Sequence, residues 1–281
     1  MDIQQRTPTT PVDKYVEHFF HVRGYDPEHR VERIVPDGRC NIVIELDGQR
    51  RAVVDNETHE PQQICTGAWV SGPHRDYFSI TALPNSCLIA IRFLPGGLFS
   101  FLDRPVDEIA GQVIPGEELL DGALLHLRKE LLQQQTAEAR LAMVDRWLLA
   151  RLDETRQPPP TIQQAIQAIL TQPTAGKLQD LVDASGYSRK QFNHLFKKHV
   201  GLSPKIFQRI LRFGQILERV QQIQPISWAT LSVECGYTDQ SHFIKDFQGF
   251  SGFNPAEFLS TDPDRLNFFP MDGDPDLGES A

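Results

Sequence analysis

One short stretch of the chain carries basic and amide side chains at the spacing of a helix face. Lys190, His194 and Lys197 recur every three or four residues, and Asn193 and Lys198 flank them. Lysine can donate to guanine O6 and N7, and asparagine can form two hydrogen bonds with adenine. Residues 189–198 include four basic residues and no acidic one, which favours phosphate contacts. This stretch therefore predicts a helix that reads a DNA major groove.

A second copy of the same pattern follows about fifty residues later. Gly186-Tyr187 recurs as Gly236-Tyr237 with a shift of 50, after which one inserted residue makes the shift 51. The positions paired by the shift of 51 are Phe192 and Phe243, Phe196 and Phe247, Gly201 and Gly252, Pro204 and Pro255, and Phe207 and Phe258. A duplication that keeps register over a whole supersecondary unit indicates one structural motif used twice.

Each copy predicts a helix, a glycine turn and a second helix, which is the helix-turn-helix arrangement. Ser188 or Thr238 would cap the second helix, and the aromatic residues would form its buried stripe. The predicted DNA contacts are Ser188, Arg189, Lys190, Asn193, His194, Lys197, Lys198, Thr238, Gln240, Ser241, Lys245 and Gln248. In the second helix Lys245 is set against Asp239 and Asp246. The alternative is a pair of ordinary helical hairpins with solvated charges, and the in-register repeat favours DNA binding.

The second copy, GYTDQSHFIKDFQGFSGFNPAEF, resembles the signature of AraC/XylS-type transcriptional regulators, and the first copy is similar to that family's first helix-turn-helix. The resemblance covers roughly residues 162–259. It implies double-stranded DNA and RNA polymerase as partners, and a long helix at 204–222 that holds two recognition helices for successive major grooves. By position, the base readers would be Lys190, Asn193, His194, Gln240, Ser241 and Lys245. His194 stands where the family often has arginine.

The charge of the chain is distributed unevenly. The net charge is −9 over 281 residues, yet Lys and Arg exceed Asp and Glu by three within residues 161–260. The acidity lies in residues 1–160 and in the tail, so the local field still favours DNA. The four cysteines have no CxxC spacing, and there is no signal peptide and no long apolar run. These features predict a cytoplasmic protein without membrane contact, cofactor or metal.

The N-terminal part predicts an α+β chain, in which a small β-barrel or cupin-like domain precedes the all-α domain. Short apolar runs separated by turn residues predict strands; they are residues 31–35, 40–46, 51–54, 63–66, 77–81 and 87–94. From about residue 98 the period changes to that of helices, at 98–102, 117–135 and 137–152. The predicted domains are residues 1–155 and 161–260, joined by a Pro-rich linker at 156–160. Thr161, directly after the linker, would cap the first helix of the second domain.

In regulators that this chain resembles, the barrel takes an effector and the following helices often dimerise the protein. A small-molecule effector and a homodimer are therefore possible partners. Trp69, Tyr77, Phe78 and Arg92 are the candidate lining of a ligand cavity, and core aromatics with a snorkelling arginine are the alternative. The sequence holds no catalytic motif, so we predict that the chain is not an enzyme. A small-molecule-processing barrel and a pure protein-interaction module remain as alternative functions of this half.

Two further sites of chemistry were weighed against plainer explanations. His18 and His21 could chelate a metal if they shared a helical face, and surface or satisfied histidines are the alternative. Cys40, Cys65 and Cys87 could sense oxidants, although buried cysteine more often packs as a small apolar residue. The acidic tail, residues 261–281, is predicted to be disordered, with local docking around 266–270 as an option.

Overall fold

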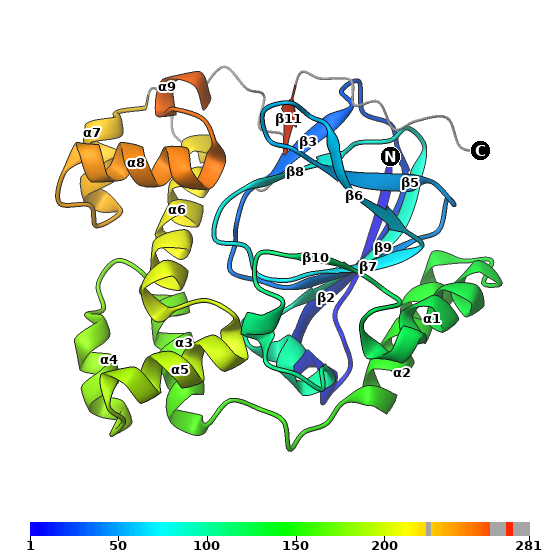
Figure 1. Cartoon of the computed structure of the whole chain (residues 1–281), viewed down its shortest axis with the longest axis horizontal. Coiled ribbons are helices and arrows are strands. Elements are labelled where there is room, and N and C mark those ends of the chain that lie inside the picture. Colours follow the sequence, from blue (N-terminus) through cyan, green and yellow to red (C-terminus); the bar gives the residue numbers. More distant parts are fainter. Residues whose placement is uncertain (223–225, 259–267, 272–281) are drawn as a thin grey trace.

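The computed structural model describes residues 1–222, 226–258 and 268–271. An N-terminal β domain with attached helices lies beside a helical domain, and one long helix runs through the helical domain (Figure 1). This arrangement confirms the predicted α+β class, with antiparallel strands first and helices after them. Among the described residues, no helix is both long enough and apolar enough to cross a membrane.

The β domain consists of two antiparallel sheets. The six-stranded sheet has the order β1-β2-β9-β4-β7-β10, and its strands are β1 (Asp2–Arg6), β2 (Val16–Tyr25), β9 (Ser86–Phe93), β4 (Asn41–Glu45), β7 (Ala68–Ser71) and β10 (Val113–Pro115). The five-stranded sheet has the order β11-β3-β8-β5-β6, and its strands are β11 (Phe268–Met271), β3 (Val31–Ile34), β8 (Phe78–Thr81), β5 (Arg50–Val54) and β6 (Pro61–Thr66). A cluster of Val43, Cys65, Trp69, Ile80 and Val113 fills the space between the sheets.

The opposite face of the six-stranded sheet packs on helices. Ile42, Ile44, Ile89 and Ile91 alternate with residues of the inner face, as the period of a strand requires. They share one apolar core with α1 (Ala123–Leu132) and α2 (Ala137–Arg151), and with the 3-10 helices η2 (Gly97–Phe101) and η3 (Val106–Glu108). The helix predicted at 117–135 begins only at Ala123, because Gly122 before it is left-handed with φ 69°.

The helical domain contains two helix-turn-helix units joined by α6 (Pro204–Gln222), the range predicted for the connecting helix. The first unit contains α3 (Pro160–Thr171), α4 (Leu178–Ser185) and α5 (Arg189–Val200). The second unit contains α7 (Trp228–Glu234), α8 (Gln240–Ser251) and α9 (Pro255–Phe258). One apolar core spans both units, and Phe213 of α6 packs there against Phe247 and Phe250 of α8.

Two details of the predicted chain ends are wrong. Thr161 does not cap α3, because the helix starts one residue earlier at Pro160, where proline suits a first turn. Within the tail predicted to be disordered, Phe268–Met271 instead form β11, antiparallel to β3. The local docking expected around residues 266–270 is therefore present at Phe268–Met271, and the rest of the predicted tail lies outside the described residues.

Candidate nucleic-acid interface

Helix α5 buries an aromatic face and turns its polar face outward. Ser188 is the N-cap, and its hydroxyl accepts from the backbone N–H of Gln191. Gly201 ends the helix in the left-handed conformation. Phe192 and Phe196 are fully buried in the helical core, so the side chains on the opposite face must point away from it.

The predicted contacts on α5 lie on that outer face. The exposed members are Ser188, Arg189, Lys190, His194 and Lys197, and Asn193 is partly exposed. Lys198 differs from them, because its ammonium lies 5.7 Å from the centre of the Phe99 ring in the β domain. Lys198 is therefore turned toward the β domain rather than grouped with the other basic side chains.

Helix α8 repeats this design with a shifted start. Its N-cap is Asp239, whose carboxylate accepts from the backbone N–H of His242, so the prediction that Thr238 caps this helix is wrong. Thr238 is the extra residue of the second copy, and Asp239 takes the place that Ser188 has in the first. Thr238, Gln240, Ser241, Lys245 and Gln248 are all exposed. Asp239 also places a carboxylate at the positive end of the α8 dipole, where it is favourable.

The second acidic residue of α8 is used inside the domain. Asp246 is 1% exposed, and its carboxylate accepts from Arg209 Nε of α6 at 3.0 Å and from the Tyr237 hydroxyl at 3.3 Å. The hydrogen bond with Asp246 raises the pKa of Arg209. The expectation that Asp246 opposes Lys245 on the outer face is therefore wrong, because the carboxylate points inward and fixes α8 to α6.

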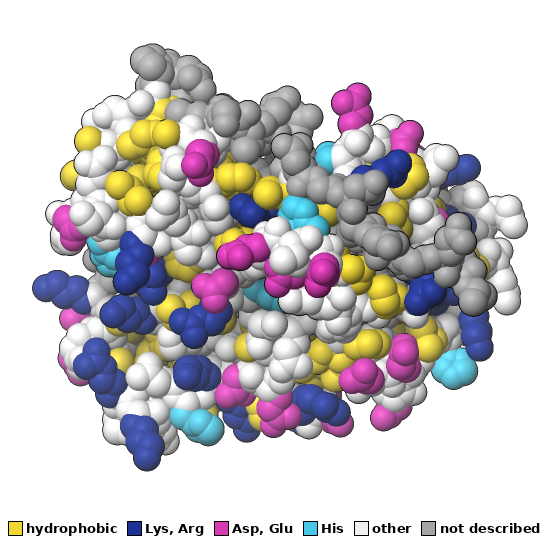
Figure 2. Space-filling view, turned by 45° about the horizontal axis from the view of Figure 1, so that its top comes forward, with side chains coloured by type: hydrophobic (Ala, Val, Ile, Leu, Met, Phe, Trp, Pro, Cys, Tyr) yellow, Lys and Arg dark blue, Asp and Glu magenta, His cyan; other side chains and the backbone are white. Residues whose placement is uncertain are grey.

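The basic side chains gather on the helical domain (Figure 2). Its left side in that view shows many lysines and arginines, whereas acidic side chains are more frequent toward the middle of the molecule. On the face drawn in Figure 2, the left side of the molecule is thus the richer in basic side chains. A polyanion that approaches this face meets mainly positive side chains.

The four predicted ligand contacts do not form one site. Tyr77 and Phe78 line a common cavity of about 400 Å³ in the β domain. Trp69 lies in the core, where its indole N–H donates to Glu45 Oε1, and burial raises the pKa of Glu45 to about 7. Arg92 forms ion pairs with Glu17 and Asp37, so its charge is satisfied within the protein and it is not a lining residue.

Sequence reasoning missed a histidine that lines that cavity. His74 stacks on Phe78 with ring centres 4.2 Å apart, and its buried Nε2 atom has no hydrogen-bond partner among the residues that the structure describes. Burial lowers the pKa of His74 to about 4, so the ring is neutral at pH 7. Its place after a Ser-Gly-Pro turn carried no signal of a binding role.

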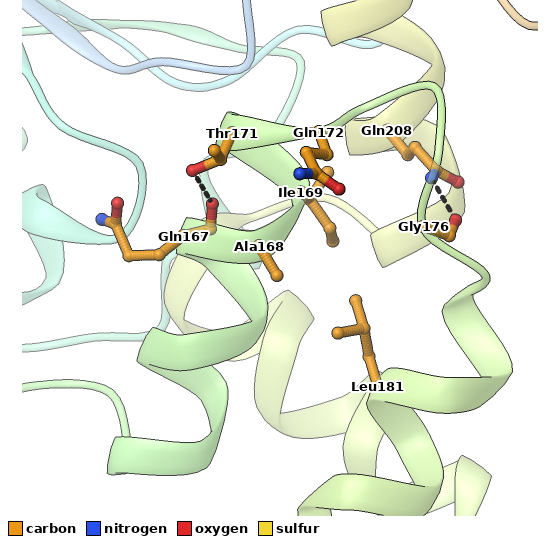
Figure 3. A pocket seen from close by; sticks show the side chains of 8 residues that line it. All are labelled: Gln167, Ala168, Ile169, Thr171, Gln172, Gly176, Leu181 and Gln208. Carbon is orange, nitrogen blue, oxygen red and sulfur yellow. Dashed lines mark hydrogen bonds between the residues drawn. The ribbon is translucent and has the colours of Figure 1, made fainter.

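A second cavity, of about 390 Å³, lies in the helical domain between α3, α4 and α6 (Figure 3). Gln208 donates there to the carbonyl of Gly176, and Thr171 donates to the carbonyl of Gln167. Leu181 and Ile169 face its interior. None of the predicted DNA contacts lines this cavity.

The histidines and cysteines that could carry metal or redox chemistry have simpler roles. His18 and His21 lie on strand β2 rather than on a helix, and a spacing of three places them on opposite faces. His18 packs on Phe20, and His21 Nε2 is 2.9 Å from Arg140 Nη1. In the described part of the chain, no group of three acidic, histidine or cysteine side chains could hold a metal ion.

The cysteines of the β domain are in environments that suppress thiolate formation. Cys40 and Cys65 are buried, and Cys87 is partly exposed. Burial raises the pKa of all three thiols, that of Cys65 to about 12. Since the thiolate is the reactive form, these side chains behave as packing residues.

Two known families match separate parts of the chain. Residues 4–115 match a family described as "Domain of unknown function (DUF6597)", and residues 181–261 match a family described as "Helix-turn-helix domain". The second match, of the AraC type, covers both recognition helices. Residues 181–261 therefore match a helix-turn-helix domain, in agreement with the two motifs of the structure.

Individual proteins of known sequence or structure are also similar to this chain. An uncharacterized HTH-type transcriptional regulator from Haemophilus influenzae is 24% identical over 159 residues, which are 56% of this chain and 49% of the relative. The chain thus spans about half the length of that relative. A variant of ToxT from Vibrio cholerae matches with a TM-score of 0.47 and 11% identity, over 91% of this chain and 99% of ToxT. ToxT with a bound unsaturated fatty acid matches with a TM-score of 0.45 and 11% identity, over 90% of this chain and 96% of ToxT.

Proposed function

Because the chain carries a helix-turn-helix domain of the AraC type, we propose that it is a sequence-specific transcription regulator that reads two successive major grooves with α5 and α8. One observation carries this proposal. The two equivalent helices bury equivalent phenylalanines and leave the predicted base readers exposed or partly exposed. An exposed face of lysine, amide and hydroxyl groups can contact base edges and phosphates together.

On α5, we assign base contacts to Lys190, Asn193 and His194. Arg189 and Lys197 are assigned to phosphates, because guanidinium and ammonium groups at the rim of a groove meet the backbone first. Lys198 was predicted to share that role, and its position over Phe99 supports a weaker contribution. The His194 imidazole can supply hydrogen bonds to base edges.

On α8, we assign base contacts to Gln240, Ser241 and Lys245. Gln248 and Thr238 lie at the two ends of the exposed face and suit phosphate contacts. Because Asp246 points into the core, Lys245 is opposed on this face only by Asp239 at the helix start. This geometry supports a stronger role for the second helix than its charge count suggests.

The experiment is selection of DNA by the full-length protein from a random-sequence pool, followed by footprinting and salt titration of the selected site. We expect protection of two segments about one helical turn apart, and affinity that falls steeply as salt rises. Lys14→Ala, in the β domain, is the control for loss of a lysine elsewhere. If no sequence is enriched over random DNA, the proposal is wrong.

The β-domain cavity supports a second component, an effector site. Its volume of about 400 Å³ and its lining by Tyr77, Phe78 and Val113 suit a small planar molecule. The unpartnered Nε2 of His74 would form a hydrogen bond with such a ligand. The test is a melting shift of the full chain with a panel of planar aromatic acids and amides, repeated with His74→Leu. A shift that His74→Leu leaves unchanged would contradict this site.

A further inference from the structure

Each recognition helix touches the β domain at the same position of the repeat. Gly201 ends α5 with φ +84°, and Gly252 ends α8 with φ +73°. A Cβ atom at Gly201 would lie 2.4 Å from Pro73, and one at Gly252 would lie 2.5 Å from Arg33 Nη1. The β domain thus presents one docking site, here called a seat, to each recognition helix. Both seats contact the carboxy-terminal end of their helix.

The seat for α8 is built around Arg33 of β3. The Arg33 guanidinium lies 4.3 Å from the ring centre of Tyr77 and 4.5 Å from that of Phe253. Its Nη1 donates to the carbonyl of Ser251, the last residue of α8, at 3.0 Å. A cation at this position also complements the negative end of the helix dipole. Arg33 is only 5% exposed, so the contact is made out of water, where such interactions are stronger.

The seat for α5 is apolar and aromatic. Phe99 of η2 meets His199 of α5 edge to face, with ring centres 4.4 Å apart. Gly201 packs on Pro73 and Val106, and α5 runs against η2 and η3. These contacts leave the predicted base readers of α5 at the surface.

The helix that joins the two recognition helices has a weak point of its own. Gly214 lies near the middle of α6, and a Cβ atom there would meet nothing within 4 Å. Glycine inside a helix costs stability relative to alanine, and here no close packing requires it. A third contact, of Phe207 against Gly38, holds α6 to the β domain on the side of Gly214 that leads to α5.

From these contacts we infer that the β domain fixes the orientation of α5 relative to α8, and that Arg33 is the residue that positions α8. The inference rests on the proposed DNA reading. A rigid pair of helices loses less conformational freedom when it binds two grooves at once, so docking raises DNA affinity. Arg33 itself lies behind α8 and touches no DNA in this scheme.

The test compares Arg33→Gln with the unchanged full-length protein on the DNA site that the latter selects. The half-site of each helix is first identified by the bases whose discrimination is lost with Lys190→Ala or Lys245→Ala. We expect Arg33→Gln to weaken binding about tenfold and to lose protection of the α8 half-site before the α5 half-site. Arg30→Gln, an exposed arginine on the approach to the same strand, is the matched control and should bind as the unchanged protein does.

Arg33→Lys keeps the charge and should recover part of the α8 protection, which loss of folding would not explain. If Arg33→Gln fails to fold, Phe253→Leu removes the aromatic ring that contacts Arg33 from the helical domain. This variant should give the same loss of protection, confined to the α8 half-site. Equal weakening of both half-sites, or tighter binding by Arg33→Gln, would overturn the inference. Absence of any selected site would instead refute the proposed function.

Discussion

The buried ion pair between α6 and α8 allows a prediction with a defined order of effects. Asp246 is 1% exposed, whereas the Arg209 side chain is 28% exposed. Arg209→Leu leaves a carboxylate inside the core, and removal of one partner of a buried pair costs about 3–5 kcal/mol. Because water reaches the Arg209 side of the pair, we expect the lower end, a loss of about 3 kcal/mol in the free energy of unfolding.

The reciprocal change should be milder. Asp246→Leu leaves an arginine that can turn toward solvent, and we expect a loss of about 1 kcal/mol. The first copy of the repeat has Leu195 at the position equivalent to Asp246, so an apolar side chain is compatible with this fold. The double variant Arg209→Leu, Asp246→Leu should therefore be closer to the unchanged protein than Arg209→Leu alone.

The assay is urea unfolding of the full-length variants, followed by circular dichroism. Arg219→Leu is the matched control, because Arg219 lies on α6 like Arg209 but pairs with Glu234 of α7 at the surface. The side-chain exposures of Arg219 and Glu234 are 43% and 47%. We expect this control to cost under about 1 kcal/mol. If Arg209→Leu is no more harmful than Arg219→Leu, or if the double variant is worse than both singles, the reasoning on burial is wrong.

Three further predictions concern DNA, pH and thiols. Lys190→Ala or Lys245→Ala should each cost about 1–3 kcal/mol of DNA binding and relax discrimination at particular base pairs, measured by selection; uniform weakening on all sequences would mean phosphate contact only. The pKa of His74 in the folded protein, about 4, lies below the unfolded value of about 6.5, so the unfolded chain binds the extra proton. As the pH falls from about 6.5 to 4, the free energy of unfolding from urea titrations should fall by about 3 kcal/mol, a loss that His74→Leu does not show. Cys40 and Cys65 should not react with a thiol reagent in the folded protein, and prompt modification of either, detected by mass spectrometry, would contradict their burial.

The helical domain was predictable because its signals are local. Phenylalanines at helical spacing, a glycine at each helix end and an in-register repeat predict α5, α6 and α8, and the structure has them at those positions. The cap of α8 was mispredicted because both Thr238 and Asp239 are good capping residues. Only the shift of 51 residues after the insertion distinguishes them, because this shift aligns Asp239 with Ser188.

The β domain was predictable in kind and only partly in detail. The predicted apolar runs coincide with strands β3, β4, β5, β6, β8 and β9. Strand β7 consists of four buried residues without alternation, so it gave no periodic signal. The contact of Arg33 with Ser251 joins residues 218 positions apart, and nothing local marks Arg33 as different from other strand arginines. Such pairs depend on how the domains dock, which short-range patterns do not contain.

The position of β11 has a consequence for work with fragments. Phe268–Met271 cover the outer edge of β3, so the backbone groups of Val31–Ile34 pair with the far end of their own chain. A fragment that stops before residue 268 exposes this edge, which can then recruit a strand from another molecule. Self-association of such a fragment would reflect an uncovered sheet edge and would not be evidence of a dimer contact in the full-length protein. Phe268–Met271, more than 230 residues away in the sequence, therefore shield the edge of β3 against aggregation.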